Sequence, residues 1–140
     1  MKVRCLVDNG KSLSKRHQHQ GSSPNYTREY LEPGKVYNVY GIMLIGNTLH
    51  YLIACREANS PHFEPAEFFE LVENSVPPSW FYTHFRETDV ETNADAIWGY
   101  KELALNINHN IELVERTSEA FKVFYIRKNE IDEWTNEQTH

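Results

Sequence analysis

The sequence predicts an α+β protein, with a small β-barrel in the N-terminal half and two or three helices in the C-terminal part. Two observations support this prediction. Between residues 31 and 72, short segments rich in β-branched and aromatic residues alternate with turns that contain Gly or Pro. After residue 94, the apolar residues recur at helical spacing instead. The length of 140 residues fits one domain that can bury a hydrophobic core of its own.

The N-terminal segment predicts a strand and a long loop. Residues 2–7 form the first expected strand, because their apolar side chains alternate along the chain. Residues 12–26 are almost entirely polar, which predicts a loop of unusual length. Residues 32–35, Glu-Pro-Gly-Lys, fit a type II turn, since Pro favours its second position and Gly its third.

A β-hairpin is predicted next. Strands at residues 36–42 and 49–55 flank the turn Ile-Gly-Asn-Thr at residues 45–48. A short strand, a helical turn that starts near Pro65 and a last strand are then expected at residues 61–63, 64–67 and 68–72. Five short strands with one helical turn before the last strand are the pattern of a small SH3-like barrel.

The C-terminal part predicts helices. Residues 74–93 contain two adjacent prolines and are expected to form a linker. A helix is expected over residues 94–105, and the poor helix formers at residues 106–110 interrupt it. Two more helices are expected at residues 111–115 and 119–135. The single domain 1–140 thus divides into a barrel part at 1–73, a linker at 74–93 and a helical part at 94–135.

The charge is distributed unevenly. The net charge is −6, but residues 1–35 carry seven Lys and Arg against three acidic residues, and residues 36–140 carry seven against seventeen. An acidic body repels phosphate backbones, so nucleic-acid binding is not expected, and a basic protein is the expected partner. The chain has no apolar run long enough for a membrane span and no signal-peptide core, which predicts a cytoplasmic protein. Cys5 and Cys55 are expected to be buried thiols in strands.

Three groups of residues were weighed for chemistry. His17 and His19 have the spacing of a metal-binding pair, but no further ligand lies near them in sequence. Cys55 lies near two histidines in sequence, but nothing indicates a lowered thiol pKa. The acidic residues have the spacing of solvated faces, and phosphate-binding loops and nucleophile elbows are missing. The sequence therefore predicts no catalytic residue, metal or cofactor.

Aromatic residues are abundant in the barrel half, and alternation along strands places some of them outside. Exposed Tyr and Trp beside acidic residues make a good protein-binding surface, because they bury a large area at low entropic cost. The residues predicted to bind a partner are Tyr40, Tyr51, Glu64, Glu67, Glu70, Trp80 and Tyr82.

Several segments resemble a group of small uncharacterised bacterial proteins with an SH3-like barrel and a helical tail. They are residues 32–42, 65–72, 77–81, 97–103 and 128–133. Small acidic bacterial proteins of this kind are often immunity proteins that neutralise a toxin. The resemblance implies a fold more directly than an activity, and it assigns no functional residue.

Three functions remain open at this point. The first is an immunity-type protein that binds a basic toxin domain. The second is an SH3-like regulatory or ligand-binding module, in which the basic residues between 11 and 16 would take part. The third is an enzyme of unrecognised type that uses His and Glu in a cleft. A monomer and a homodimer are both compatible with the sequence.

Overall fold

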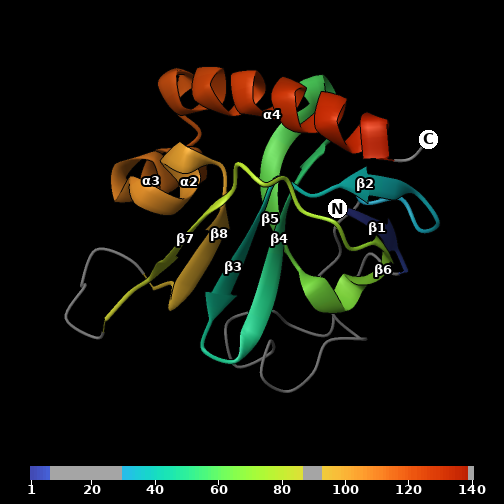
Figure 1. The fold of residues 1–140 in the computed structure, drawn as a ribbon, viewed down its shortest axis with the longest axis horizontal. Coiled ribbons are helices and arrows are strands. Elements are labelled where there is room, and N and C mark those ends of the chain that lie inside the picture. Colours follow the sequence, from blue (N-terminus) through green and yellow to red (C-terminus); the bar gives the residue numbers. More distant parts are fainter. Residues whose placement is uncertain (7–29, 87–92, 139–140) are drawn as a thin grey trace.

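The structure is a computed structural model that describes residues 1–6, 30–86 and 93–138. It is an α+β fold of two antiparallel sheets and a long C-terminal helix (Figure 1). The strands are β1 (Lys2–Cys5), β2 (Val36–Asn38), β3 (Gly41–Ile45), β4 (Thr48–Cys55), β5 (Ser60–Pro65), β6 (Phe69–Glu73), β7 (Phe81–His84) and β8 (Ala96–Gly99). The helices are the short 3-10 helices η2 (Glu57–Asn59) and η3 (Ala66–Phe68), and the α-helices α2 (Lys101–Leu105), α3 (Ile107–Glu115) and α4 (Ser118–Gln138).

The strands form two sheets. The three-stranded sheet has the order β2-β1-β6, and the five-stranded sheet has the order β5-β4-β3-β8-β7. The chain passes from one sheet to the other at Val39 and Tyr40: the N–H of Val39 donates to Met1 O, and the N–H of Tyr40 donates to Leu52 O. The closed barrel expected from the sequence is not confirmed, because β8 and β7 extend the second sheet at its β3 side.

Local turn chemistry explains the elements that the sequence predicted well. The β3–β4 hairpin is confirmed, with Gly46 at φ 60 in its turn. The helical turn before β6 is also present, although η3 begins at Ala66, two residues later than expected, because Glu64 and Pro65 belong to β5. Cys5 and Cys55 are buried free thiols in strands, as predicted.

The helix predicted at residues 94–105 is wrong over its first half. Ala96–Gly99 form β8, which pairs with β3 on one side and with β7 on the other. Tertiary pairing here overrides the local helical pattern, and the helix begins only at Lys101. The predicted linker likewise contains β7. The predicted break at residues 106–110 is present only at Asn106, where α2 has ended, because residues 107–110 already belong to α3. The Asn106 side chain accepts from the N–H of His109 and caps α3.

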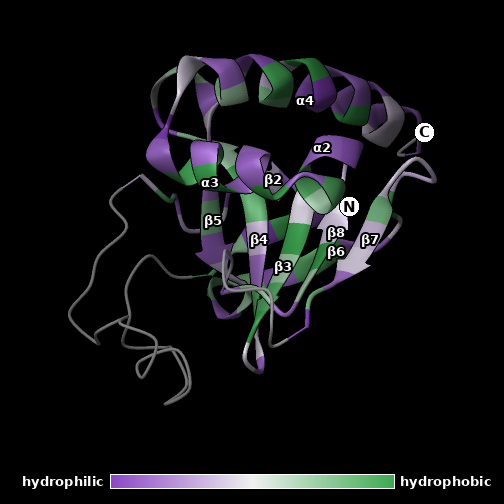
Figure 2. Ribbon diagram, turned by 90° about the vertical axis from the view of Figure 1, so that its left-hand side faces the viewer, coloured by the Kyte–Doolittle hydropathy of each residue, from purple (hydrophilic) through white to green (hydrophobic). Residues whose placement is uncertain are grey.

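Two expectations fall outside the described residues. They are the polar loop at residues 12–26 and the histidine pair at positions 17 and 19. The predicted strand at residues 36–42 is divided into β2 and β3 by the crossing between the sheets. The last helix is confirmed, and α4 lies as a layer across one end of both sheets (Figures 1 and 2).

A pair of glycines lets α2 approach the five-stranded sheet closely. Gly41 of β3 and Gly99 of β8 are opposite one another in the register, and the fully buried side chain of Leu103 packs over them. A Cβ at Gly99 would lie 2.6 Å from Leu103 Cδ2 and 3.2 Å from the Tyr40 carbonyl oxygen. A Cβ at Gly41 would meet the same Leu103 methyl group. The helix can take this position because neither glycine carries a side chain.

A carboxylate on α4 fastens this helix to the crossing between the sheets. Asp132 Oδ1 accepts from the Tyr40 hydroxyl at 2.6 Å and from Asn38 Nδ2 at 2.8 Å. Asp132 Oδ2 accepts from Lys128 Nζ at 2.6 Å. The three donors come from both ends of the chain, so Asp132 joins the C-terminal helix to the strand that changes sheets.

Replacing Gly99 with Ala is expected to lower the free energy of unfolding by about 1–3 kcal/mol, because the new methyl group overlaps Leu103. In a Leu103→Val background, the Gly99→Ala replacement is expected to lower the free energy of unfolding by less, because Val lacks the Cδ2 methyl group with which the new side chain overlaps. Denaturant unfolding of the two single variants and the double variant measures this coupling. Strictly additive costs would contradict the close-packing explanation.

Replacing Asp132 with Ala is expected to lower the free energy of unfolding by about 1–3 kcal/mol, because the buried Tyr40 hydroxyl loses its acceptor. Glu133→Ala is the matched control, since Glu133 is the next residue of α4 and is exposed. Its unfolding free energy is expected to stay within about 0.5 kcal/mol of the wild type. Equal free energies of unfolding for the two variants would contradict this role of Asp132.

Candidate functional site: the β7 edge and its hollow

Strand β7 lies at the outer edge of the five-stranded sheet. It pairs with β8, and no other described strand pairs with it (Figure 2). Neighbouring residues of a strand point to opposite faces, yet Phe81 is 43% exposed and Tyr82 is 53% exposed. Both faces of β7 at these residues are therefore open to solvent, and so is its unpaired backbone edge. We call this strand with its two exposed rings the β7 edge.

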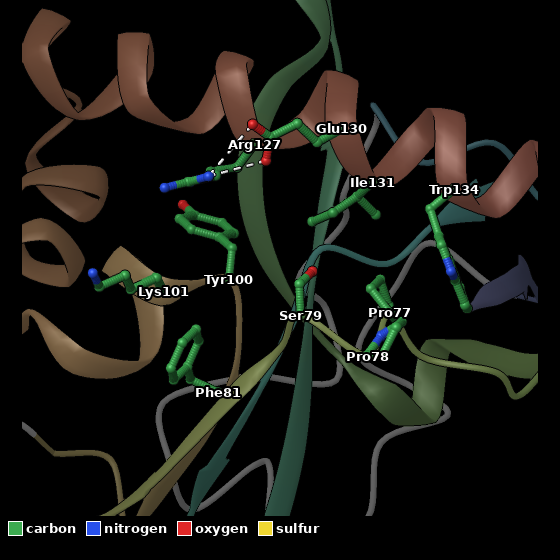
Figure 3. A pocket seen from close by; sticks show the side chains of 10 residues that line it. All are labelled: Pro77, Pro78, Ser79, Phe81, Tyr100, Lys101, Arg127, Glu130, Ile131 and Trp134. Atoms are coloured by element: carbon green, nitrogen blue, oxygen red, sulfur yellow. Dashed lines mark hydrogen bonds and ion pairs between the residues drawn. The ribbon is translucent and has the colours of Figure 1, made fainter.

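A hollow of about 380 Å³ adjoins the β7 edge. Its lining combines the segment before β7, the start of α2 and one face of α4 (Figure 3). The α4 residues follow helical spacing, which places them on the same side of that helix. The lining residues are Pro77, Pro78, Ser79, Phe81, Tyr100, Lys101, Arg127, Glu130, Ile131 and Trp134.

Arg127 connects the two helices that border the hollow. Its Nε donates to Glu102 Oε1 at 2.7 Å and its Nη2 donates to Glu102 Oε2 at 2.8 Å. Its Nη1 donates to Glu130 Oε2 at 3.0 Å, within the lining itself (Figure 3). The bidentate pair holds α2 against α4, and the hydrogen bonds from Arg127 lower the pKa of Glu102 below its ordinary value.

Tyr100 lies between β8 and α2, and its hydroxyl is hydrogen-bonded to His109. The Tyr100 hydroxyl and His109 Nε2 are 2.6 Å apart, and both side chains are buried. Burial raises the pKa of Tyr100 above its ordinary value and lowers that of His109. Both groups are therefore neutral near neutral pH, and a hydrogen bond joins the phenol to the uncharged imidazole. This bond fixes the ring that forms one wall of the hollow.

The predicted partner-binding residues do not form one surface. Tyr82 belongs to the β7 edge, and its ring lies 5.0 Å from the Trp98 ring. Trp80 precedes β7 and is partly buried against the core cluster that contains Val3 and Phe68. Glu67 and Glu70 are exposed, but they lie on η3 and β6, and Glu70 pairs with Arg4 at 2.7 Å.

Three further predicted residues are buried or partly buried. Tyr40 is only 3% exposed and donates to Asp132, and Glu64 is 1% exposed and accepts from Tyr30. Neither can offer its side chain to a partner in this conformation. Tyr51 is partly buried on β4, opposite Glu64 in the register.

None of the ten residues that line the hollow was among the predicted binding residues, and these ten include Phe81, Lys101, Arg127 and Trp134. The two prolines next to an aromatic run were a signal for Phe81. Arg127 and Trp134 could not be linked to Phe81 from sequence, because α4 reaches β7 only in the folded chain.

Comparison with known protein families, with curated proteins and with solved structures finds no match to this chain. Among the described residues, no three or more His, Cys, Asp or Glu side chains gather in a way that could hold a metal ion. No helix in the described ranges is long and apolar enough to cross a membrane.

The Glu102–Arg127 pair predicts a pH-dependent stability difference. Because the pKa of Glu102 is lowered in the folded protein, its contribution is present above the unfolded-state pKa of about 4.3 and is lost as the pH falls through the lower folded-state pKa. At pH 7, Glu102→Gln is expected to lower the free energy of unfolding by about 1 kcal/mol.

This difference between the wild type and Glu102→Gln is expected to shrink as the pH falls below about 4. Denaturant unfolding at several pH values measures it, with the exposed Glu119→Gln as control. A difference that stays constant down to the acid limit would contradict the role of the ion pair.

Proposed function

We propose that this protein is a non-enzymatic binding protein of the toxin-immunity type, and that the β7 edge contacts a basic toxin domain. One observation carries the proposal: two aromatic side chains are exposed on opposite faces of a strand whose outer edge pairs with no described strand, beside a hollow. An unpaired edge offers backbone donors and acceptors to a partner strand, and exposed edges are otherwise avoided because they promote unwanted pairing.

The side chains at this edge suit the centre of a protein interface. Phe81 and Tyr82 contribute large area with few rotatable bonds, which is why aromatic residues are enriched among the residues that dominate binding energy. The hollow behind them provides a recess for a side chain of the partner. Its lining offers both apolar rings and the charged ends of Lys101 and Glu130.

The charge of the chain favours a basic partner. From residue 36 onward the acidic residues exceed the basic residues by ten, and α4 exposes Glu130, Glu133 and Glu137. A nuclease domain fits this chemistry, because the surface that binds its phosphate substrate is basic. Long-range attraction between such surfaces speeds association and weakens with added salt.

An SH3-like interaction module is the alternative that a specific observation favours. Strand β6 follows η3 and returns to pair with β1, and the chain from residue 36 to residue 45 passes from one sheet to the other. The helical turn before the last of these strands belongs to the SH3-like pattern expected from the sequence. In this alternative the ligand is a peptide of a larger complex. An enzyme of unrecognised type is a second alternative.

The double variant Phe81→Ser/Tyr82→Ser is expected to lose the partner. The test immobilises the full chain, captures proteins from its native cells at low salt and at high salt, and identifies them by mass spectrometry. The wild type is expected to retain a basic protein at low salt and release it at high salt. Cells that express the captured protein together with the wild type are expected to survive. Cells that express it together with the double variant are expected to die.

Ile126→Ser is the matched control, because Ile126 is also exposed and apolar but lies elsewhere, on α4. It is expected to retain the partner and to protect the cells. Capture that is equal for the wild type and the double variant would show that the β7 edge is not the binding surface. A retained partner without toxicity would favour the interaction-module alternative.

A further inference from the structure

A second hollow, away from the β7 edge, is lined by two arginines. It has a volume of about 630 Å³ and lies between the β4–β5 connection and the junction of α3 with α4. Arg56 follows β4 and Arg116 follows α3, so the two guanidinium groups come from distant parts of the sequence. Among the residues whose side chains the structure describes, the rest of the lining is formed by Tyr30, Ala58, Ser60, Phe121 and Tyr125 and carries no acidic group. The chain as a whole has an excess of acidic residues, whereas the charged side chains of this hollow are basic.

Each guanidinium group is held against an aromatic ring. Arg56 Cζ lies 5.1 Å from the centroid of Tyr30, and Arg116 Cζ lies 4.8 Å from the centroid of Phe121. Arg116 Nη1 also donates to the Pro61 carbonyl oxygen at 3.2 Å. Stacking engages the face of a guanidinium group and leaves N–H donors in its plane available for an oxyanion.

Neither arginine forms an ion pair with a carboxylate of the described residues. Arg4 and Arg127, by contrast, both have carboxylate partners at 2.7 Å. Two positive charges that line one hollow repel each other. A bound anion of two negative charges would offset this repulsion.

Both arginines stand at backbone positions that favour glycine. Arg56 has φ 65 and ψ −164, a region that is almost restricted to glycine, and Arg116 has φ 63 and ψ 41 at the C-terminal end of α3. A non-glycine residue in such a conformation costs about 1–3 kcal/mol. Ala58 and Asn59, in the same turn as Arg56, also have positive φ, so this turn holds Arg56 in a fixed conformation beside the hollow.

The remaining walls fix the shape of the hollow and supply rings. The Tyr125 hydroxyl donates to the Ala58 carbonyl oxygen at 2.7 Å, which joins α4 to the β4–β5 connection. Tyr125 and Phe121 pack edge to face, with their centroids 6.2 Å apart. The volume lies within the range of about 300–1,000 Å³ that is usual for small-molecule sites, and it exceeds what a lone phosphate needs.

We propose that this hollow binds a small aromatic phosphate monoester of nucleotide size. Arg56 and Arg116 bind the phosphate oxygens through the N–H groups that stacking leaves available. The aromatic part of the ligand lies against the walls formed by Phe121 and Tyr125. Phosphate binding by the two guanidinium groups is compatible with the acidic charge of the rest of the chain, because the arginines contact the phosphate directly.

Isothermal titration calorimetry of the full chain at low salt tests the proposal, with four probes: adenosine 5′-monophosphate, phenyl phosphate, inorganic phosphate and adenosine. The two aromatic monoesters are expected to bind. Adenosine and inorganic phosphate are each expected to bind at least about tenfold more weakly, since each lacks one of the two recognised parts. Failure of both monoesters to bind at millimolar concentration would overturn the proposal, and so would equal affinity for adenosine or for inorganic phosphate.

Arg56→Gly and Arg116→Gly separate binding from folding. Each is expected to lower the affinity for the monoesters by about tenfold or more, while the melting temperature is kept or rises because the backbone strain is relieved. Arg4→Gln is the control, since Arg4 lies on β1 and pairs with Glu70, and its affinity is expected to be unchanged. If a glycine variant is less stable than the wild type, the affinity of the corresponding Arg→Gln variant for the monoesters is measured instead. Unchanged affinity in the Gln variants would overturn the proposal.

Discussion

The contact of Leu103 with the paired glycines Gly41 and Gly99 is the constraint on which the rest of the structure depends. It brings the backbone of α2 close to the sheet where β8 joins β3. The chain before this contact then has to run as a strand, which extends the sheet to β7. The residues just after Gly99 are thereby placed beside β7, where Tyr100 and Lys101 line the hollow.

The long helix α4 is positioned by two polar contacts that act at different places. Arg127 binds Glu102 of α2, and Asp132 binds the side chains at the crossing between the sheets. These partners of α4 lie on α2, which packs on the five-stranded sheet, and at the crossing between the two sheets. The face between these two contacts closes the hollow at the β7 edge, so the proposed binding surface is a consequence of how the helices rest on the sheet.

Two surfaces of contrasting chemistry result from this arrangement. The β7 edge exposes rings and an unpaired strand in a chain whose excess charge is negative, which suits a basic protein. The hollow between Arg56 and Arg116 presents stacked guanidinium groups, which suit a small anion. The two surfaces share no lining residue. A small ligand in the second hollow therefore does not compete directly for the β7 edge.

The sequence predicted the elements whose signals are local. The turn at Gly46 predicted the β3–β4 hairpin, and the Pro65 region predicted η3. Both predictions rest on turn chemistry, which depends on only a few neighbouring residues. Strand β8 was missed, because Ala96–Gly99 resemble a helix until β3 and β7 lie on either side of them.

The candidate sites depended on contacts that no local pattern records. Alternation could not tell that Tyr40 faces the core, since its acceptor Asp132 is 92 residues away. The positions of Arg56 and Arg116 gave no signal either, because a residue that adopts a glycine-like backbone cannot be distinguished in sequence from one that does not. Of the predicted binding residues with aromatic side chains, Tyr82 is exposed, at 53%.

Hydrogen–deuterium exchange of the free protein and of its complex with the captured partner tests the central claim most directly. If the β7 edge binds the partner, the backbone amides of Phe81–His84 and of Ser79 and Trp80 become protected in the complex. The amides of β1 and β6 are expected to exchange as in the free protein. Protection that appears only in the three-stranded sheet, with β7 unchanged, would contradict the proposed binding surface.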